Sequence, residues 1–255
     1  DEVAGWARQN DPNITIENML LSGNTDDLVI DALRGIRDTE ADIYYFNFGQ
    51  HSGKFFQDEL GNFYVAPQQD ILIEPITNGW KITADDGTKY FFNQTETNST
   101  QSGNFDQTVT SAWYLGEIKS HDEQRNISFS YTNSQYNYTT LGKEVKYALQ
   151  VSQQLGSGNT PCTAPNGNFS VSNAYNTPRL SQITFKNGYI DLVAMTDRCD
   201  LIGDKRLDRI EIHSNSKLLR SFELDYKYFG DTDDGCNFST AADKRLVLTE
   251  ILEKK

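Results

Sequence analysis

The residues best suited to bind a metal ion form one short acidic segment, DTDDGCN, which starts at Asp231. Its carboxylates Asp231, Asp233 and Asp234 are hard oxygen ligands of the kind that Ca²⁺ prefers. The segment departs from an EF-hand loop, because Gly235 stands where a third ligand is needed and the twelfth position is Ala242. The sequence therefore favours a polar hairpin loop here, with a calcium site as the alternative, and predicts no other cofactor.

Adjacent carboxylates and histidines are the other residue types that could do chemistry. Glycoside hydrolysis needs only two carboxyl groups, about 5 to 10 Å apart. Adjacent acidic pairs such as Asp85/Asp86, Asp122/Glu123 and Asp233/Asp234 are therefore candidates, and the three histidines are His51, His121 and His213. Each acidic pair lies in a predicted turn, and the histidines lack the spacing of a zinc site or of an activated nucleophile, which makes them solvated turn residues. We therefore predict no catalytic residues, and keep a glycosidase-like enzyme as an alternative.

Aromatic side chains could instead bind a sugar, because Trp and Tyr combine a flat apolar surface with a polar tip. The candidates for such a surface are Trp80, Tyr90 and Trp113, with the aromatic run IYYFNF over 43–48. In this run, Ile43 and Tyr45 alternate with Tyr44, Phe46 and Phe48, so both strand faces are apolar. This pattern is typical of a central strand covered on both sides. We favour a core strand, with a carbohydrate-binding surface as the alternative.

Composition limits the partners and leaves the redox state open. The net charge is -13 and there is no basic cluster, which argues against nucleic acid as a partner. No apolar run approaches the ~18 residues that span a bilayer. The three cysteines, Cys162, Cys199 and Cys236, cannot all pair with one another, so one disulfide and no disulfide are both compatible with the sequence.

The elements that must position these residues are predicted to be mainly β-strands. Aromatic residues make up 12% of the chain, and with many Thr, Ile and Val residues they favour strands. Residues 1–40 form a separate segment with a small helical element, since Asn24 or Thr25 can cap an amphipathic stretch that ends near Gly35. Residues 41–255 are predicted to form an antiparallel β domain, either a β-sandwich or a curled stack of β-hairpins.

Turns and loops are predicted from the Gly, Asn, Asp and Pro residues between the strands. Asp86-Gly87 is typical of a tight hairpin turn, here between strands over 80–84 and 88–92. The stretches 93–110 and 156–177 are polar and lack any periodicity, which predicts two long loops.

An irregular repeat occupies residues 112–255. In four segments a Leu precedes an Ile by three positions: Leu115/Ile118, Leu180/Ile183, Leu207/Ile210 and Leu248/Ile251. After each of the first three comes a polar turn and then an alternating strand, so each unit is predicted to be a hairpin with one apolar face. The fourth unit stops after its first strand, at Lys255, and we expect the native chain to continue with more units.

An ordered set of segments resembles the region upstream of the repeats in secreted Rhs/YD-repeat-like proteins of Bacteroidetes. The set consists of GIRDTEADIYYFNFGQHSGKF from Gly35, DGTKYFF, AWYLGEIKSHDEQRNISFSY, DKRLDRIEI with LLRSFELDYKYF, and DKRLVLTEI. The Tyr-Asp repeat itself is absent, and Asp225-Tyr226 has the two residues in reverse order. The chain therefore resembles the region that precedes such repeats, and not the repeats themselves.

The resemblance implies a secreted or cell-surface protein whose hairpins wind into a shell. On this basis we expect a non-enzymatic scaffold segment whose main partner is the remainder of its own polypeptide. A carbohydrate-binding β module, with glycans as partners, is the first alternative.

Overall fold

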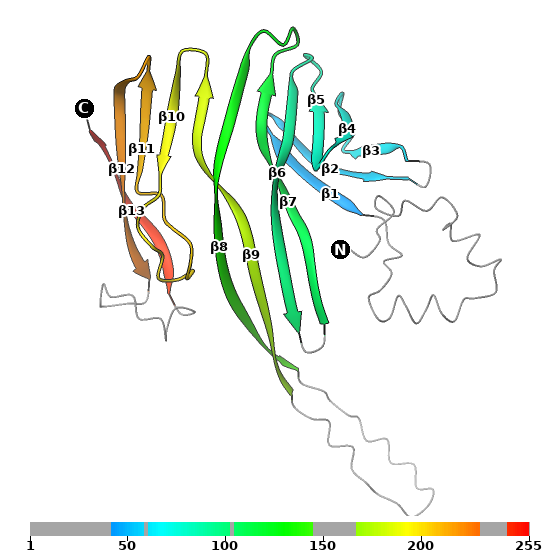
Figure 1. The fold of residues 1–255 in the computed structure, drawn as a ribbon. Helices are drawn as coiled ribbons and strands as arrows, with labels where there is room; N and C mark the ends of the chain where they lie inside the picture. Colours follow the sequence, from blue (N-terminus) through cyan, green and yellow to red (C-terminus); the bar gives the residue numbers. More distant parts are fainter. Residues whose placement is uncertain (1–41, 59–60, 103–104, 145–166, 230–243, 255) are drawn as a thin grey trace, which may run out of the picture.

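The computed structural model describes residues 42–58, 61–102, 105–144, 167–229 and 244–254, whose path is drawn in Figure 1. Within these ranges the chain forms thirteen β-strands and no helix. All the strand pairs are antiparallel. The prediction of a mainly β, antiparallel fold is thus confirmed. The helical element predicted within 1–40 lies outside the described residues.

A small sheet of three strands comes first in the chain: β1 (Ile43–Phe48), β2 (His51–Gln57) and β3 (Phe63–Ala66), in that order. Because side chains alternate along a strand, Phe46 and Phe48 share one face of β1, and both are buried. Tyr45 lies on the opposite face and is 79% exposed.

The prediction that the run 43–48 is a central strand covered on both sides is therefore wrong. Among the described strands, β1 is an edge strand of its sheet, and only its inner face is covered. Tyr45 and Ile43 point outward. A tyrosine tolerates this position because its hydroxyl group stays solvated although its ring is apolar.

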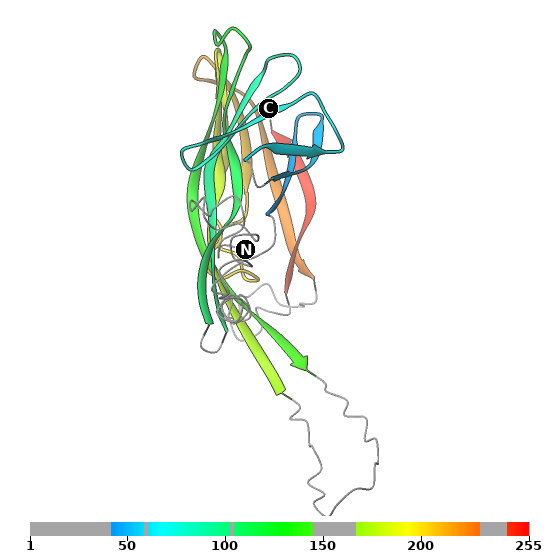
Figure 2. The ribbon, with the colours of Figure 1, turned by 90° about the vertical axis from the view of Figure 1, so that its right-hand side faces the viewer.

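The other ten strands form one large sheet whose strand order follows the chain order. They are β4 (Leu72–Ile76), β5 (Gly79–Thr83), β6 (Lys89–Ser102), β7 (Phe105–Lys119), β8 (Asn126–Glu144), β9 (Gly167–Phe185), β10 (Gly188–Val193), β11 (Arg209–Ser214), β12 (Lys217–Phe229) and β13 (Arg245–Lys254). The predicted Asp86-Gly87 turn joins β5 to β6, and Gly87 has a φ of 79°, a conformation that favours glycine. Figure 2 shows the small sheet and the β12–β13 end on the same side of the long strands, so the large sheet is curled.

The hydrophobic core lies where the small sheet packs against one end of the large sheet. Phe46, Phe48 and Phe55 from the small sheet meet Ile73 and Ile82 from β4 and β5. These five side chains are all buried, and Trp80, Tyr90 and Phe92 pack around them. The burial of these large apolar side chains is the main contribution of the sequence to stability at this end.

An unbroken row of apolar side chains runs from this core across six strands of the large sheet. Each member is the cross-strand partner of the next: Ile73, Ile82, Tyr90, Ile118, Ile127 and Phe185. We call these residues the apolar row. Its first two members lie beneath the small sheet, whereas Ile127 and Phe185 are exposed. The same face of the sheet is therefore covered at one end and uncovered at the other by the described residues.

The predicted loops over 93–110 and 156–177 are wrong where the structure describes them. Residues 93–102 and 105–110 belong to β6 and β7, and residues 167–177 belong to β9. These strands lack apolar periodicity because their side chains bond to one another across the sheet instead of packing into a core. Thr100 Oγ1 donates a hydrogen bond of 3.0 Å to Asn173 Oδ1 in this way.

Strand β9 changes its second partner half-way along its length. It pairs with β8 throughout, but its other edge pairs with β6 over Ser172–Asn176 and with β10 over 182–185. Strands β6, β7, β8 and β9 are therefore hydrogen-bonded in a closed ring. At the change, the buried hydroxyl of Thr177 donates to Glu96 Oε2 at 2.7 Å, and Tyr114 donates to the same oxygen at 3.1 Å.

Candidate functional site

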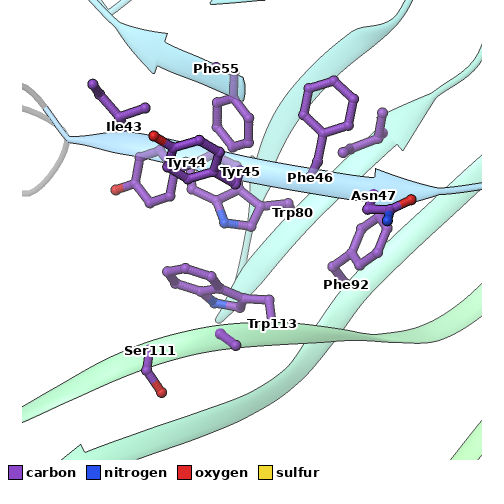
Figure 3. A pocket seen from close by; sticks show the side chains of 12 residues that line it. Ile43, Tyr44, Tyr45, Phe46, Asn47, Phe55, Trp80, Phe92, Ser111 and Trp113 are labelled. Atoms are coloured by element: carbon purple, nitrogen blue, oxygen red, sulfur yellow. The ribbon is translucent and has the colours of Figure 1, made fainter. Parts of the chain in front are cut away.

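An aromatic pocket lies between β1 and the strands β5, β6 and β7, with a volume of about 290 Å³ (Figure 3). The ring centroids of Trp80 and Trp113 are 6.0 Å apart, with their planes at 79°. Tyr44 from β1 contacts both indoles, at 5.0 Å and 5.9 Å between centroids. The structure thus brings together two of the three residues predicted for a ligand surface.

The pocket is built for apolar contact with a few neutral hydrogen-bonding groups. Its polar side chains are Asn47, Ser111 and the two tyrosines Tyr44 and Tyr45, and none of the described residues that line it is charged. Such a lining suits a neutral ligand with a flat face and hydroxyl groups.

Tyr90, the third predicted residue, lies elsewhere. Its ring packs against Phe48 at 4.7 Å, and it lines a separate, more polar hollow together with His51, Asp85 and Asp86. Burial raises the pKa of Tyr90, so its hydroxyl stays protonated and cannot act as a base at neutral pH.

The acidic pairs considered for catalysis are used to fix turns. Asp86 accepts a hydrogen bond from the backbone N–H of Thr88, which lowers the pKa of Asp86. Asp122 accepts from the hydroxyl of Ser120, and this bond lowers its pKa. A general acid needs a raised pKa instead, so neither carboxylate is adapted to that role. The third pair, Asp233/Asp234, lies outside the described residues.

The calcium candidates Asp231, Asp233 and Asp234 likewise lie outside the described residues. The histidines fall at three separate places: His51 begins β2, His121 is in the exposed turn before β8, and His213 is in β11. The expectation of a solvated turn residue is wrong for His213, whose side chain is largely buried by the neighbouring strands.

A network of ion pairs in the segment 194–208, which connects β10 to β11, positions the last strand of the sheet. Arg198 forms two hydrogen bonds to Asp200, at 3.0 Å and 2.8 Å. Asp200 in turn accepts a hydrogen bond of 3.1 Å from the backbone N–H of Leu246, at the start of β13. On the other side, Arg179 of β9 binds the buried Asp204. The segment therefore joins β9 to β13 across the sheet.

Strand β13 forms an edge of the large sheet and carries apolar side chains into solvent. It pairs with β12 on one side, and no strand of the described ranges pairs with its other side. Val247, Leu248 and Ile251 are exposed, the last by 58%. An edge with unpaired backbone groups and exposed apolar residues is a template for adding another strand.

Cys199 is disulfide-bonded, and its partner cysteine lies outside the described residues. This selects one disulfide from the alternatives that the cysteine count left open. Cys199 precedes Asp200, which bonds to the start of β13, and the N–H of Cys199 donates a hydrogen bond of 2.8 Å to the hydroxyl of Tyr228 in β12.

Comparison with protein-family models, with curated proteins and with solved structures gives no match to this chain. In the part of the chain that the structure describes, there is no helix long and apolar enough to cross a membrane.

Sequence reasoning missed the network around Asp204 and the surroundings of His213. A signal was present in both places. Asp191 is the one charged residue in the apolar run of β10, Glu211 and His213 alternate with Ile210 and Ile212 in β11, and Arg198 is followed by the opposite charges Asp200 and Asp204 within one short segment. Only the pairing of the strands shows which of these charges meet.

Proposed function

We propose that the chain is a non-enzymatic scaffold segment of a larger secreted or cell-surface protein of the Rhs/YD-repeat-like kind. The observation that carries the proposal is the outer edge of β13, which has exposed apolar side chains and no paired strand within the described ranges. The next hairpin unit of the same polypeptide is the partner that fits this edge best, because hairpins β4 to β13 already pair in chain order.

The uncovered end of the apolar row supports the same proposal. A sheet face that is buried beneath β1–β3 at one end and exposed at Ile127, Phe185 and Ile251 at the other calls for a further layer. Continued winding of the curled sheet would provide that layer and would close the shell around its apolar side.

The disulfide at Cys199 supports a location outside the reducing cytosol, because disulfides persist mainly in oxidising compartments. The glycosidase-like alternative needs two carboxylates facing one cleft, and the described pairs are engaged in turns.

The proposal is tested by amide hydrogen exchange in this chain and in the longer natural polypeptide. We expect the outward-facing amides of β13 to exchange slowly in the longer protein and quickly in the isolated chain, whereas the amides of β5 should be equally protected in both. The proposal is contradicted if the outward-facing amides of β13 exchange equally fast in both proteins, or if the natural sequence contains no further hairpin units.

A carbohydrate-binding module is the second candidate, and the contact between Trp80 and Trp113 favours it. The test is a glycan array probed with the chain and with Trp113→Ala, using Tyr64→Ala as a control that removes an exposed aromatic residue outside the pocket. Binding that is lost in Trp113→Ala alone supports this candidate. No bound glycan, or equal loss in both variants, rejects it.

A further inference from the structure

Three side chains with metal-binding atoms converge on one face of the neighbouring strands β10 and β11. They are Asp191, Glu211 and His213, and one donor atom from each lies within 4.8 Å of the others. Asp191 and Glu211 are direct cross-strand partners, and His213 follows on the same face because side chains two apart in a strand point the same way. We propose that these three residues form a binding site for a divalent transition-metal ion such as Zn²⁺.

One oxygen of each carboxylate has a polar neighbour, a hydrogen-bonded amide for Asp191 and an ion-pair partner for Glu211, and the other oxygen is directed toward the imidazole. Asp191 Oδ1 accepts a hydrogen bond of 2.8 Å from Gln182 Nε2, and its Oδ2 lies 3.8 Å from His213 Nε2. Glu211 Oε1 lies 2.6 Å from Arg209 Nε, and its Oε2 lies 3.4 Å from the same imidazole nitrogen. Partners of this kind orient metal ligands and add to the affinity of the site.

The imidazole ring of His213 is held in place by stacking on Tyr189. The two rings are cross-strand partners, with centroids 4.5 Å apart and planes inclined by 11°. The nitrogen that faces the carboxylates is Nε2, and this is the atom that would bind the ion. Because the strands and Tyr189 fix the ring, little freedom is lost when the ion binds.

The charges around the site also favour a cation. Like charges directly opposite each other on two strands destabilise a sheet, and Asp191 and Glu211 are such a pair. Arg209 compensates the charge of Glu211, but the bond to Asp191 comes from the neutral amide of Gln182. With a neutral imidazole one negative charge stays uncompensated, and a divalent ion removes this repulsion.

The spacing and the donor types select the class of ion. With bonds of ~2.0 to 2.2 Å, neighbouring ligand atoms of a tetrahedral zinc site are about 3.3 Å apart. The observed 3.4 Å and 3.8 Å reach this value with small side-chain rotations. An imidazole ligand favours a transition metal over Ca²⁺, which prefers oxygen alone. Three protein ligands leave a fourth position for water or for a donor from another molecule.

The experiment is a Co²⁺ titration of the chelator-treated chain, followed by visible absorption and then by displacement with Zn²⁺. Free thiols are alkylated beforehand, and millimolar Ca²⁺ occupies any oxygen-only site such as the segment that starts at Asp231. We expect one Co²⁺ per chain and displacement by Zn²⁺. Glu211→Gln and His213→Gln should each weaken Co²⁺ binding by at least ~10-fold. His121→Gln, in the exposed turn, should leave it unchanged.

Circular dichroism checks that each variant is folded, and Asp191→Asn, which keeps the shape of the side chain, replaces any variant that is not. The proposal is overturned if the chain binds no Co²⁺ under these conditions. It is equally overturned if folded variants of Asp191, Glu211 and His213 retain the affinity of the unsubstituted chain.

Discussion

Arg179 and Asp204 form a two-bond ion pair that ties strand β9 to the segment 194–208. The guanidinium Nε lies 3.1 Å from Asp204 Oδ1, and the second nitrogen lies 2.7 Å from Oδ2. The carboxylate is only 1% exposed, and it also accepts from the hydroxyl of Ser134 at 2.7 Å. A buried carboxylate with so many donors fixes the position of the segment that anchors β13.

Replacement of Asp204 by Asn should lower the free energy of unfolding by about 2 to 3 kcal/mol, because Arg179 and Arg198 lose their shared counter-charge. The expected loss is smaller than for a fully buried ion pair, because Arg179 is 39% exposed and water screens its charge. Urea denaturation measures the effect. Asp197→Asn is the matched control: its ion pair with Lys205 is exposed, and the expected change is below about 0.5 kcal/mol. Equal effects of the two substitutions would contradict the role given to burial.

Stability should fall on acidification because Asp200, the carboxylate that binds the start of β13, becomes protonated. Burial alone would raise the pKa of Asp200, but hydrogen bonds from Arg198 and from the N–H of Leu246 outweigh it and lower the pKa. A carboxyl with a lowered folded-state pKa contributes stability above its unfolded value of ~3.9, and this contribution is lost as the pH falls through the folded-state pKa. Denaturation measured from pH 6 down to ~pH 2 should show this loss. In Asp200→Asn the free energy of unfolding should fall less steeply with pH below ~pH 4. An unchanged slope would contradict the role of Asp200 in holding β13.

Alkaline pH tests the packing between β7 and β8. Burial raises the pKa of Tyr131 to about 12, and its hydroxyl donates a hydrogen bond of 2.7 Å to the carbonyl of Leu115. This raised pKa contributes stability that is complete below the ordinary value of ~10 and is lost as the pH rises toward the folded-state value. Tyr131→Phe should cost about 1 kcal/mol at neutral pH.

The tyrosinate absorbance provides the control for that substitution. Burial, with the nearby Glu96 carboxylate, also raises the pKa of Tyr114 to about 12. The absorbance phase near this pH should therefore shrink in Tyr131→Phe and in Tyr114→Phe, and most in the double variant. A phase that persists in the double variant would show that other tyrosines titrate there.

The two ends of the apolar side of the sheet should differ sharply in their sensitivity to substitution. Ile82 is 2% exposed between the sheets, and Ile82→Ala should cost about 2 to 5 kcal/mol through lost burial and a residual cavity. Ile251→Ala removes the same atoms from an exposed position in β13 and should cost less than about 1 kcal/mol. Thermal or urea unfolding of the isolated chain makes the comparison. A large loss for Ile251→Ala would mean that this side chain is already covered in the isolated chain.

The sequence was most informative where local pattern alone determines structure. Asp86-Gly87 specified its hairpin, because the turn requires a positive φ that glycine adopts without strain. The spacing of Leu115 to Ile118 and of Leu180 to Ile183 located β7 and β9. Each pair spans a β-bulge with one extra residue, which places both apolar side chains on the same face despite the spacing of three. These features depend on neighbours along the chain.

The features that the sequence did not reveal depend on contacts between distant strands. The polar parts of β6 and β9 carry no apolar alternation, because they bond to each other through side chains such as Thr100 and Asn173. Strand β1 is covered on one face and exposed on the other, and this difference depends on where the small sheet packs against the large one. The meeting of Trp80 with Trp113, and of Asp191 with His213, likewise requires the strand register.

The change of partner along β9 also determines how the protein responds to a pulling force. A load on β13 would act first on its pairing with β12 and on its hydrogen bond to Asp200 in the segment 194–208. Once these bonds break, β12, β11 and β10 would detach in succession, because they follow one another in the sheet. The process would stop at β9, because its first half is bonded to β6 as well as to β8, and separating it requires both ladders to break together. The ring of β6 to β9 would then act as a mechanical clamp, which keeps the aromatic end of the protein intact while its C-terminal hairpins are stretched.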